Sequence, residues 1–410
     1  MHPGMPHGVL LEIYQAALTA VDGARCVAAE LTVRPLAGRI WAVALGKAAS
    51  AMLAGAFESL GERLERALLI TKHGHLQGRE FPRSEVLLAA HPVPDDSSLA
   101  AGQRLLDFMA AAPADITWLF LISGGASSLV EVLPEGVSLT EVQRANQWLL
   151  ASGLPIGQMN AIRRRLSLIK GGRLCGYLGQ RPTRVLLISD VPGDDPAVIA
   201  SGLLHVTVSN ESLPAQLPVW LRALVNRDDA VLADQPTAQF DTEIVARLEQ
   251  ALDAAASVAA AHGYHVYRSH ERLHGDALLA GQQIAATLRA GAPGVYLWGG
   301  ETTVRLPDHP GQGGRCQQLA LAAAQVLAGQ DSVYLLAAGT DGNDGPGDVA
   351  GACVDGRTLE RGSLAGLDAA VALQCADAGR FLEGAGDLLD TGPTGTNVTD
   401  VVIGLKLADV

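Results

Sequence analysis

Short apolar runs alternate along the chain with longer segments of helical periodicity. The short runs are rich in Val, Ile and Leu, whereas the longer segments are rich in Ala and Leu. This alternation is typical of mainly parallel sheets whose strands are joined by helices, because such strands are covered on both faces. The pattern therefore predicts an α/β fold. The expected strands are residues 40–45, 67–71, 86–90, 118–122, 185–189, 295–298, 303–306, 333–338 and 401–405.

The expected strands form two series, which indicate two domains. Residues 213–291, between the series, are typical of helices, with one further strand at 264–268. Residues 226–242 have poor periodicity and clustered Asp, as expected of a linker. We therefore predict an N-terminal Rossmann-like α/β domain over residues 1–235 and a C-terminal α/β domain over residues 236–410. Both sheets are expected to be mainly parallel and to face each other across a cleft.

Composition narrows the class of protein. The length of 410 residues, with 48% hydrophobic and 18% charged residues, indicates a folded globular chain. The 30 Lys and Arg against 43 Asp and Glu give a net charge of −13, which argues against nucleic-acid or anionic-membrane partners. The five cysteines form no paired or metal-binding motif, and no apolar run is long enough to span a membrane. We expect a cytoplasmic protein, a monomer or homodimer, that acts on a small molecule.

Almost every expected strand runs directly into a loop of glycine with charged or hydroxyl residues. In open α/β sheets the ligand crevice lies at the carboxyl ends of the strands, so these loops are expected to converge on one edge of each sheet. The loops are residues 46–47, 72–75, 91–96, 123–128, 190–195, 299–302 and 339–345.

Three segments of the chain have features of anion-binding sites. Ser123, Gly124 and Gly125 lie between a strand and a helix, where free backbone N–H groups favour a phosphate. The alternative is a tight turn that needs glycine only for its geometry. Lys47 and Arg315 each lie at a helix start, where a cation is unfavourable unless an anion is bound.

A local concentration of basic residues follows Asn160. A helix over this segment would point Asn160, Arg163 and Lys170 in one direction, which favours an anion site. A solvated basic face is the alternative reading.

Carboxylates cluster in two loops and after a third strand. Mg²⁺ is held by one or two carboxylates plus substrate phosphates, and phosphoryl transfer to an alcohol needs a carboxylate that accepts the hydroxyl proton. Asp next to Gly or Pro is also common in turns and caps, which is the simpler account of Asp195 and Asp348. The carboxylates are Asp190, Asp194, Asp195, Glu301, Asp341, Asp344 and Asp348.

Two nucleotide-binding motifs are absent from the sequence, which argues against the classes of protein that use them. The sequence has no Walker-type Gly-x-x-x-x-Gly-Lys-Ser/Thr, and no Gly-x-Gly-x-x-Gly follows any strand with an acidic residue about twenty positions on. The second absence argues against a nicotinamide cofactor. His73 and His91 next to strand ends, and Cys316, are more simply explained by packing or hydrogen bonding than by chemistry.

Together these segments resemble the class II glycerate 2-kinases, whose C-terminal half is called the MOFRL domain. No single motif carries the resemblance; the order of many does, from about residue 10 to the end. The matching strings are residues 44–48, 91–95, 121–127, 159–163 with 170–172, 189–195, 299–303, 339–342 and 391–398.

The resemblance implies ATP-dependent, Mg²⁺-requiring phosphorylation of D-glycerate to 2-phospho-D-glycerate. Members of the family are also named hydroxypyruvate reductase. By the same resemblance, Lys47 and Arg315 are cations of the cleft and Asp190 is an acidic active-site residue. We further expect substrate or nucleotide contacts and metal contacts from two sets of residues. The first set is Ser123, Gly124, Gly125, Ser127, Asn160, Arg163, Lys170, Gly313, Gly314, Thr340, Thr394 and Asn397, and the second is Asp194, Glu301 and Asp341.

The chain departs from the family pattern at three positions. Where the family usually has Gly-Gly-Arg-Asn-Gln-Glu, this chain has Cys316 and Gln318 in place of the Asn and the Glu, and Leu203 replaces a usual Pro. If the missing carboxylate binds metal or nucleotide, affinity or substrate is altered. Two rival functions therefore stay open: a reductase for hydroxypyruvate or a related acid, and a catalytically silent protein that binds sugar acids.

Overall fold

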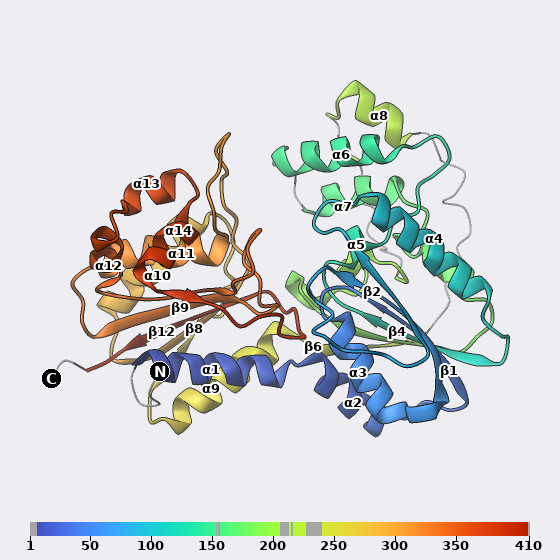
Figure 1. Ribbon diagram of the computed structural model, residues 1–410, viewed down its shortest axis with the longest axis horizontal. Helices are drawn as coiled ribbons and strands as arrows, with labels where there is room; N and C mark the ends of the chain where they lie inside the picture. The colour runs from blue at the N-terminus through green and yellow to red at the C-terminus, as the bar shows by residue number, and fades with distance from the viewer. Residues whose placement is uncertain are drawn as a thin grey trace. The chain divides into compact units, whose positions relative to one another are not determined.

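The structure, a computed structural model, describes residues 6–152, 154, 156–205, 213–214, 216–226 and 240–408. Its contacts divide the chain into two compact units. The N-terminal unit is Gly23–Ala246, and the C-terminal unit combines the residues up to Asp22 with those from Arg247 onward. Each unit has its own sheet, and the chain is coloured by residue number in Figure 1.

The N-terminal unit contains a parallel sheet with the Rossmann strand order. Its six described strands are arranged in the order β3-β2-β1-β4-β5-β6, and every neighbouring pair is parallel. The order reverses direction between β1 and β4, which is where such sheets bind ligands. The strands are β1 (Arg39–Leu45), β2 (Leu64–Lys72), β3 (Ser84–Ala89), β4 (Ile116–Ile122), β5 (Thr183–Ile188) and β6 (Asp241–Ala246).

Helices cover this sheet, and an aromatic group fills part of its core. Trp41, Phe108, Trp118 and Phe120 lie within a buried cluster, with ring centroids between 5.1 and 6.3 Å apart. Burial of such large side chains stabilises the unit. The helices are α2 (Gly23–Val33), α3 (Ala49–Leu60), α4 (Asp96–Ala110), α5 (Ala126–Leu129), α6 (Leu139–Ala151), α7 (Ile156–Arg165) and α8 (Val219–Val225).

The C-terminal unit contains a mixed sheet, which differs from the mainly parallel sheet that we expected there. The described strands have the order β11-β10-β9-β12-β8-β7, and only β7 and β8 pair in parallel. The connection from β9 to β10 is residues 340–350, too short for the crossover that a parallel pair needs. The strands are β7 (Val266–Arg268), β8 (Gly294–Gly300), β9 (Val333–Gly339), β10 (Gly351–Asp355), β11 (Leu388–Leu389) and β12 (Asp400–Lys406).

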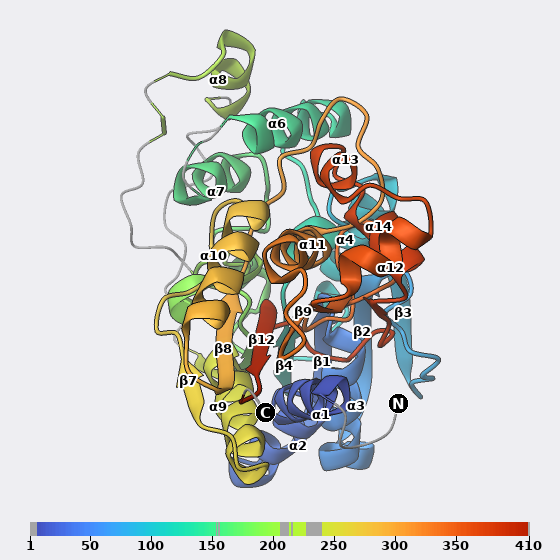
Figure 2. The ribbon, with the colours of Figure 1, turned by 90° about the vertical axis from the view of Figure 1, so that its left-hand side faces the viewer.

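Helices lie on both faces of the C-terminal sheet. Figure 2 shows α1 (Pro6–Ala20) and α9 (Leu248–Ala261) below the strands, and α10 (Ala277–Ala290) and α11 (Arg315–Leu327) above them. The Tyr14 hydroxyl of α1 donates to the carbonyl of Gly339 at the end of β9, 2.7 Å away. The first helix therefore belongs to the C-terminal unit. The remaining helices are α12 (Thr358–Leu364), α13 (Ala369–Gln374) and α14 (Ala378–Ala385).

The α/β class and most of the expected strands are confirmed. The expected strand at 303–306 is wrong, because only Thr303 forms an isolated bridge there. The expected boundary between residues 235 and 236 lies outside the described residues. After it, β6 pairs with β5 in the N-terminal sheet, so residues up to Ala246 belong to the N-terminal unit.

No helix among the described residues of the chain combines the length and apolar character that crossing a bilayer requires. All five cysteines fall within the described residues and carry free thiols.

The turns after β1 and β4 pack directly against each other. The Ser123 N–H donates to the Leu45 carbonyl at 2.9 Å, and the Ala48 N–H donates to Ser123 Oγ at 3.0 Å. Gly46 has a φ of +119°, and a Cβ there would lie 2.3 Å from Ser123 Oγ and 2.5 Å from Ser123 O. Only glycine fits at this contact.

Helix α11 begins against a buried carboxylate. Asp344 accepts hydrogen bonds from the backbone N–H groups of Cys316 and Gln317, at 3.0 and 2.8 Å. The carboxylate therefore satisfies donors that the first turn of the helix leaves unpaired. Burial, reinforced by the negative charge of Asp400, raises the pKa of Asp344 to about 6.

We expect Gly46→Ala to lower the free energy of unfolding by about 3 kcal/mol or more, because it adds a steric clash to a strained backbone. Gly38→Ala is the matched control, since Gly38 also has a positive φ, +77°, but no atom lies within 4 Å of its Cβ position. The control should lose only about 1 to 2 kcal/mol. Urea denaturation of both variants measures the difference, and equal losses would show that the contact with Ser123 is not tight.

Asp344 predicts a pH dependence of stability. Because its folded pKa of about 6 exceeds the unfolded value of 3.8, its stabilising contribution is fully present below 3.8 and is lost as the pH rises through 6. Lowering the pH from 8 to 5 should therefore stabilise wild type relative to Asp344→Asn by about 1 to 1.5 kcal/mol. Parallel denaturation curves across this range test it, and a difference that stays constant with pH would contradict the raised pKa.

Candidate active site

The N-terminal sheet brings several polar loops to one edge. Since its strands are parallel, the segments that follow them all leave at the same edge. Lys47 follows β1, His91 follows β3, Ser123 to Gly125 follow β4, and Asp190 follows β5. The loops after β1 and β4 flank the point where the strand order reverses.

Lys47 and His91 meet at Gly125. The Lys47 N–H donates to the Gly124 carbonyl at 3.0 Å, which ties the two loops together. A Cβ on Gly125 would lie 3.1 Å from both Lys47 Cγ and His91 Cδ2, so both side chains pass over this glycine. His91, which the sequence favoured as a packing residue, thus lies beside the cation that we expected in the site.

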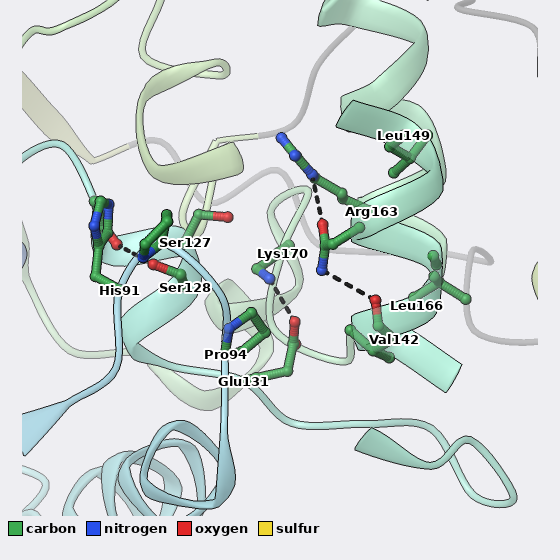
Figure 3. A pocket seen from close by; sticks show the side chains of 14 residues that line it. His91, Pro94, Ser127, Ser128, Glu131, Val142, Leu149, Arg163, Leu166 and Lys170 are labelled. Atoms are coloured by element: carbon green, nitrogen blue, oxygen red, sulfur yellow. Dashed lines mark hydrogen bonds and ion pairs between the residues drawn. The ribbon is translucent and has the colours of Figure 1, made fainter. Parts of the chain in front are cut away.

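A pocket of about 220 Å³ opens next to this meeting point, wholly within the N-terminal unit. It is bounded by the segment after β3, by α5 and its turn, by α6, and by α7 with the turn that follows (Figure 3). Its aliphatic lining comes from α6 and from the turn after α7, whereas its polar groups come both from the loops and from Asn146 and Arg163 of the same two helices. The lining residues are His91, Pro92, Pro94, Gly125, Ser127, Ser128, Glu131, Val142, Ala145, Asn146, Leu149, Arg163, Leu166 and Lys170.

Arg163 projects from α7 into this pocket with only neutral partners in the described chain. Its Nε donates to Asn146 Oδ1 at 3.0 Å, and its Nη1 donates to Asn160 Oδ1 at 3.3 Å. Burial lowers the pKa of the guanidinium, and no charged group among the described residues opposes this effect. A partly desolvated cation held by amides is suited to bind an anion.

Lys170 lies in the same pocket but is already neutralised. Its Nζ donates to Glu131 Oε2 at 2.5 Å, and the two side chains are only 5% and 2% exposed. Figure 3 shows the two side chains pointing toward each other among the residues that line the pocket. The helix that we expected to run through Lys170 ends at Arg165, and Lys170 lies in a turn. Lys170 is therefore part of an internal ion pair and not a second free cation.

Ser127 is held by a strained segment. Its hydroxyl lies 2.8 Å from the hydroxyl of Ser201, and both Ala200 and Ser201 have positive φ values, 52° and 59°. Such backbone conformations for residues other than glycine need support from their surroundings. Leu203, where the family usually has Pro, is buried in the core and does not line the pocket.

The carboxylates after β5 divide into different roles. Asp194 accepts a hydrogen bond from Ser189 Oγ at 2.6 Å, and Asp195 accepts one from the backbone of Ala197 at 2.9 Å. Asp195 therefore forms a local turn, as its position next to Pro and Asp suggests. Asp190 is half-buried at the carboxyl edge of the sheet.

The C-terminal unit holds a second polar cluster around Arg315. The guanidinium contacts Asp400 through two hydrogen bonds, at 2.6 and 2.8 Å, and Glu301 through Nη1 at 2.8 Å. Asp400 is buried, whereas Glu301 is exposed. With Asp344 capping the helix, the positive end of α11 is already matched by carboxylates. An external anion is therefore not needed to account for Arg315 at the helix start.

The strand register explains why these carboxylates gather. Asp400 opens β12 and pairs with Gly300 of β8 on one side and Gly339 of β9 on the other. Glu301 follows β8 directly, and Asp341 follows β9 after one residue. A Cβ on Gly339 would lie 3.2 Å from Asp341 Oδ1 and 3.5 Å from Asp400 Oδ1, so the two carboxylates flank this glycine.

Thr340, which follows β9, forms hydrogen bonds with the loop that precedes β12. Its hydroxyl donates to the Thr399 carbonyl at 2.6 Å and accepts from the Val398 N–H at 2.8 Å. The Thr394 hydroxyl donates to the Thr340 carbonyl. Asn397 is buried in the same loop. Thr340, Thr394 and Asn397 are thus brought together, although Thr340 uses its hydroxyl to hold the backbone.

Gly313 and Gly314 precede Arg315 and border a different hollow. Gly313 lines a cavity of about 460 Å³ in the C-terminal unit, with Gln312, Gln317 and residues 346–349 on its walls. A Cβ on Gly314 would lie 2.3 Å from Asp344 Oδ1, so this glycine permits the carboxylate to approach the helix.

The two unusual residues of this segment are buried in the fold. Cys316 is 2% exposed, and Gln318 Nε2 donates to the Leu373 carbonyl at 2.9 Å. Gln318 is therefore a core residue.

The expected metal ligands do not form a preformed cluster. Among the residues that the structure describes, no group of three or more His, Cys, Asp or Glu side chains is placed to hold a metal ion. Asp194 belongs to the N-terminal unit, whereas Glu301 and Asp341 belong to the C-terminal unit. Asp341 Oδ1 accepts from the Asn343 N–H at 3.0 Å.

Sequence reasoning missed Asp400, Glu131 and Asn146. Asp400 immediately precedes an apolar run, and it escaped attention because only the carboxyl ends of strands were expected to carry the site. Glu131 and Asn146 gave no signal, since their roles come from contacts with Lys170 and Arg163 far along the chain.

Comparison with known proteins shows which families this chain resembles. Residues 9–217 match the family model "Domain of unknown function (DUF4147)", and residues 294–400 match the MOFRL family. D-glycerate 2-kinase of Thermotoga maritima is 37% identical over 407 residues, which cover 96% of this chain and 97% of that protein. A putative hydroxypyruvate reductase of Agrobacterium vitis is also 37% identical, over 96% of this chain and 93% of that protein.

Solved structures agree with the sequence comparison. The crystal structure of glycerate kinase from Thermotoga maritima superposes with a TM-score of 0.81 at 35% identity, covering 97% of this chain and 99% of that one. Matches to both family models and near full-length similarity lead to one assignment. The chain belongs to the glycerate 2-kinase family, with a DUF4147 region followed by a MOFRL region.

Proposed function

We propose that this kinase transfers the terminal phosphoryl group of ATP to the 2-hydroxyl of D-glycerate and forms 2-phospho-D-glycerate. The observation that carries the proposal is the near full-length similarity to D-glycerate 2-kinase of Thermotoga maritima. The kinase motifs around Lys47, Asp190, Arg315 and Asp341 are present, and they lie at the loop edges of the two sheets.

In the N-terminal unit we assign the acceptor side of the reaction. Lys47, at the reversal point of the sheet, supplies a positive charge next to the pocket. Asp190 at the end of β5 is suited to accept the proton of the reacting hydroxyl, because it is a half-buried carboxylate at the same edge.

In the C-terminal unit we assign the phosphate and metal side. Mg²⁺ needs only one or two carboxylates besides the phosphates of its nucleotide, so the absence of a three-ligand cluster among the described residues is compatible with MgATP. Asp341 and Glu301 fit this demand by chemistry and position. When bound, Mg²⁺ would neutralise phosphate charge, while Arg315, oriented by Asp400, stabilises charge on the transferred group.

The reductase alternative has less support. The N-terminal sheet has the strand order of dinucleotide-binding domains, but the turn after β1 reads Leu45-Gly46-Lys47-Ala48 and lacks the glycine fingerprint. The silent-homologue alternative is weakened as well, because Cys316 and Gln318 are buried in the fold.

The free thiols favour a reducing compartment, so we propose a cytoplasmic location.

A direct assay tests the proposal. Purified protein is incubated with D-glycerate, ATP and Mg²⁺ and, in parallel, with hydroxypyruvate and NADH. We expect ADP formation only in the first mixture, with loss of activity in EDTA. Phosphorus NMR of the product distinguishes the 2-phosphate from the 3-phosphate. Oxidation of NADH without phosphoryl transfer would establish the reductase instead.

Asp190→Asn is expected to lower kcat by at least about 100-fold, because an amide cannot accept the hydroxyl proton. The melting curve should stay close to that of wild type, since Asp190 lies at a strand end and outside the apolar core. Asp195→Asn is the matched control in the same loop and should retain most activity. Unchanged kcat in Asp190→Asn would remove this residue from proton transfer.

Arg315→Ala is expected to reduce both activity and stability. Removing the guanidinium leaves Asp400 buried without its partner, which costs about 3 to 5 kcal/mol. Arg357→Ala, which breaks an exposed pair with Asp331, is the control and should unfold like wild type. Chemical denaturation measures the free energy of unfolding of the two variants. An Arg315→Ala variant as stable as wild type would show that the pair with Asp400 does not stabilise the fold.

A further inference from the structure

The pocket beneath α6 and α7 contains an unusual distribution of charge. Its two buried ionic side chains, Lys170 and Glu131, neutralise each other. The remaining permanent charge on its wall is that of Arg163, whose partners in the described chain are the amide oxygens of Asn146 and Asn160. The described lining of the pocket therefore carries one net positive charge, which suits a small monoanion.

The geometry of Arg163 specifies which of its donors are available. Nε is committed to Asn146, and one N–H of Nη1 is committed to Asn160. No other acceptor for Nη1 or Nη2 lies among the described residues, so N–H groups on these two atoms are available to the two oxygens of a carboxylate. Figure 3 shows the Arg163 side chain extended from its helix, with the guanidinium at its tip.

The rest of the lining fits a short hydroxy acid. Val142, Leu149 and Leu166 provide an aliphatic wall on the helix side, whereas Ser127 and His91 provide polar groups toward Gly125 and Lys47. A molecule with a carboxylate at one end and hydroxyls at the other finds a partner for each end.

We infer that this pocket is the acceptor subsite, in which Arg163 binds the carboxylate of the 2-hydroxy acid and Asn146 is the positioning residue that orients Arg163. This inference rests on the proposed kinase function, which it makes more specific. The acid's hydroxyl end then faces Ser127, His91 and the Lys47 loop. Neutral alcohols are poor substrates because they leave the guanidinium without an anion.

The test compares D-glycerate with its neutral analogue D-glyceramide. Wild type should prefer the acid by about 100-fold or more in kcat/KM, because the acid makes two charge-assisted hydrogen bonds. Arg163→Met should raise the KM for D-glycerate by about 100-fold and reduce the preference to within about tenfold, with little change in the KM for MgATP. Arg165→Met removes a charge from the same helix without lining the pocket, and should keep the preference.

Asn146→Asp provides an independent variant that preserves the shape of the side chain. It places a carboxylate against Arg163 Nε, so it should neutralise the guanidinium and weaken the preference for the acid in the same direction. Its KM for D-glycerate should rise while its melting temperature stays near that of wild type, a combination that a purely structural role for Asn146 would not produce.

The outcomes separate the two levels of the proposal. If wild type phosphorylates neither compound, the kinase function itself is wrong. If wild type phosphorylates D-glycerate but folded Arg163→Met and Asn146→Asp keep the wild-type preference, the function stands and the subsite is elsewhere. If Arg163→Met does not fold, Asn146→Asp alone decides by the same criterion.

Discussion

The close contact between the turns after β1 and β4 is the constraint on which the N-terminal site depends. Because the strands are parallel and the sheet reverses between them, both turns leave at the same edge. Gly46 lets Ser123 approach to a distance that any side chain would prevent. That approach ties Lys47 to Gly124 and carries its side chain over Gly125 toward His91.

Charge compensation differs among the cations of the two polar sites. Lys170 is paired with Glu131 inside the pocket, and Arg315 is paired with Asp400 at the edge of the other sheet. Removing one member of such a pair leaves an isolated buried charge, so these pairs stabilise the geometry around them. Arg163 differs, because amides orient it without cancelling its charge. Its positive charge is therefore available to a ligand.

The C-terminal unit also gathers polar residues at one edge of its sheet, but it does so through antiparallel strands. Its strand β12 runs antiparallel to both neighbours, so the beginning of β12 lies beside the ends of β8 and β9. Asp400 therefore lies close to Asp341, and Arg315 bridges Asp400 and Glu301 from the start of α11. Asp344 stabilises the same helix end from within. One sheet edge thus collects carboxylates from segments between residues 301 and 400, and a single guanidinium connects two of them.

The sequence by itself determined the fold class, most of the strands, and the positions of the polar loops, because these depend on local periodicity and on glycine next to strand ends. The order of its motifs also identified the family. Tertiary structure alone decided the direction of β10 and β12, since apolar periodicity is the same for parallel and antiparallel strands. It also decided which charges are free: Glu131 lies 39 positions before Lys170, and Asp400 lies 85 positions after Arg315. Whether a basic residue is paired with a buried carboxylate or held only by neutral groups depends on such distant neighbours, and only the folded chain brings them together.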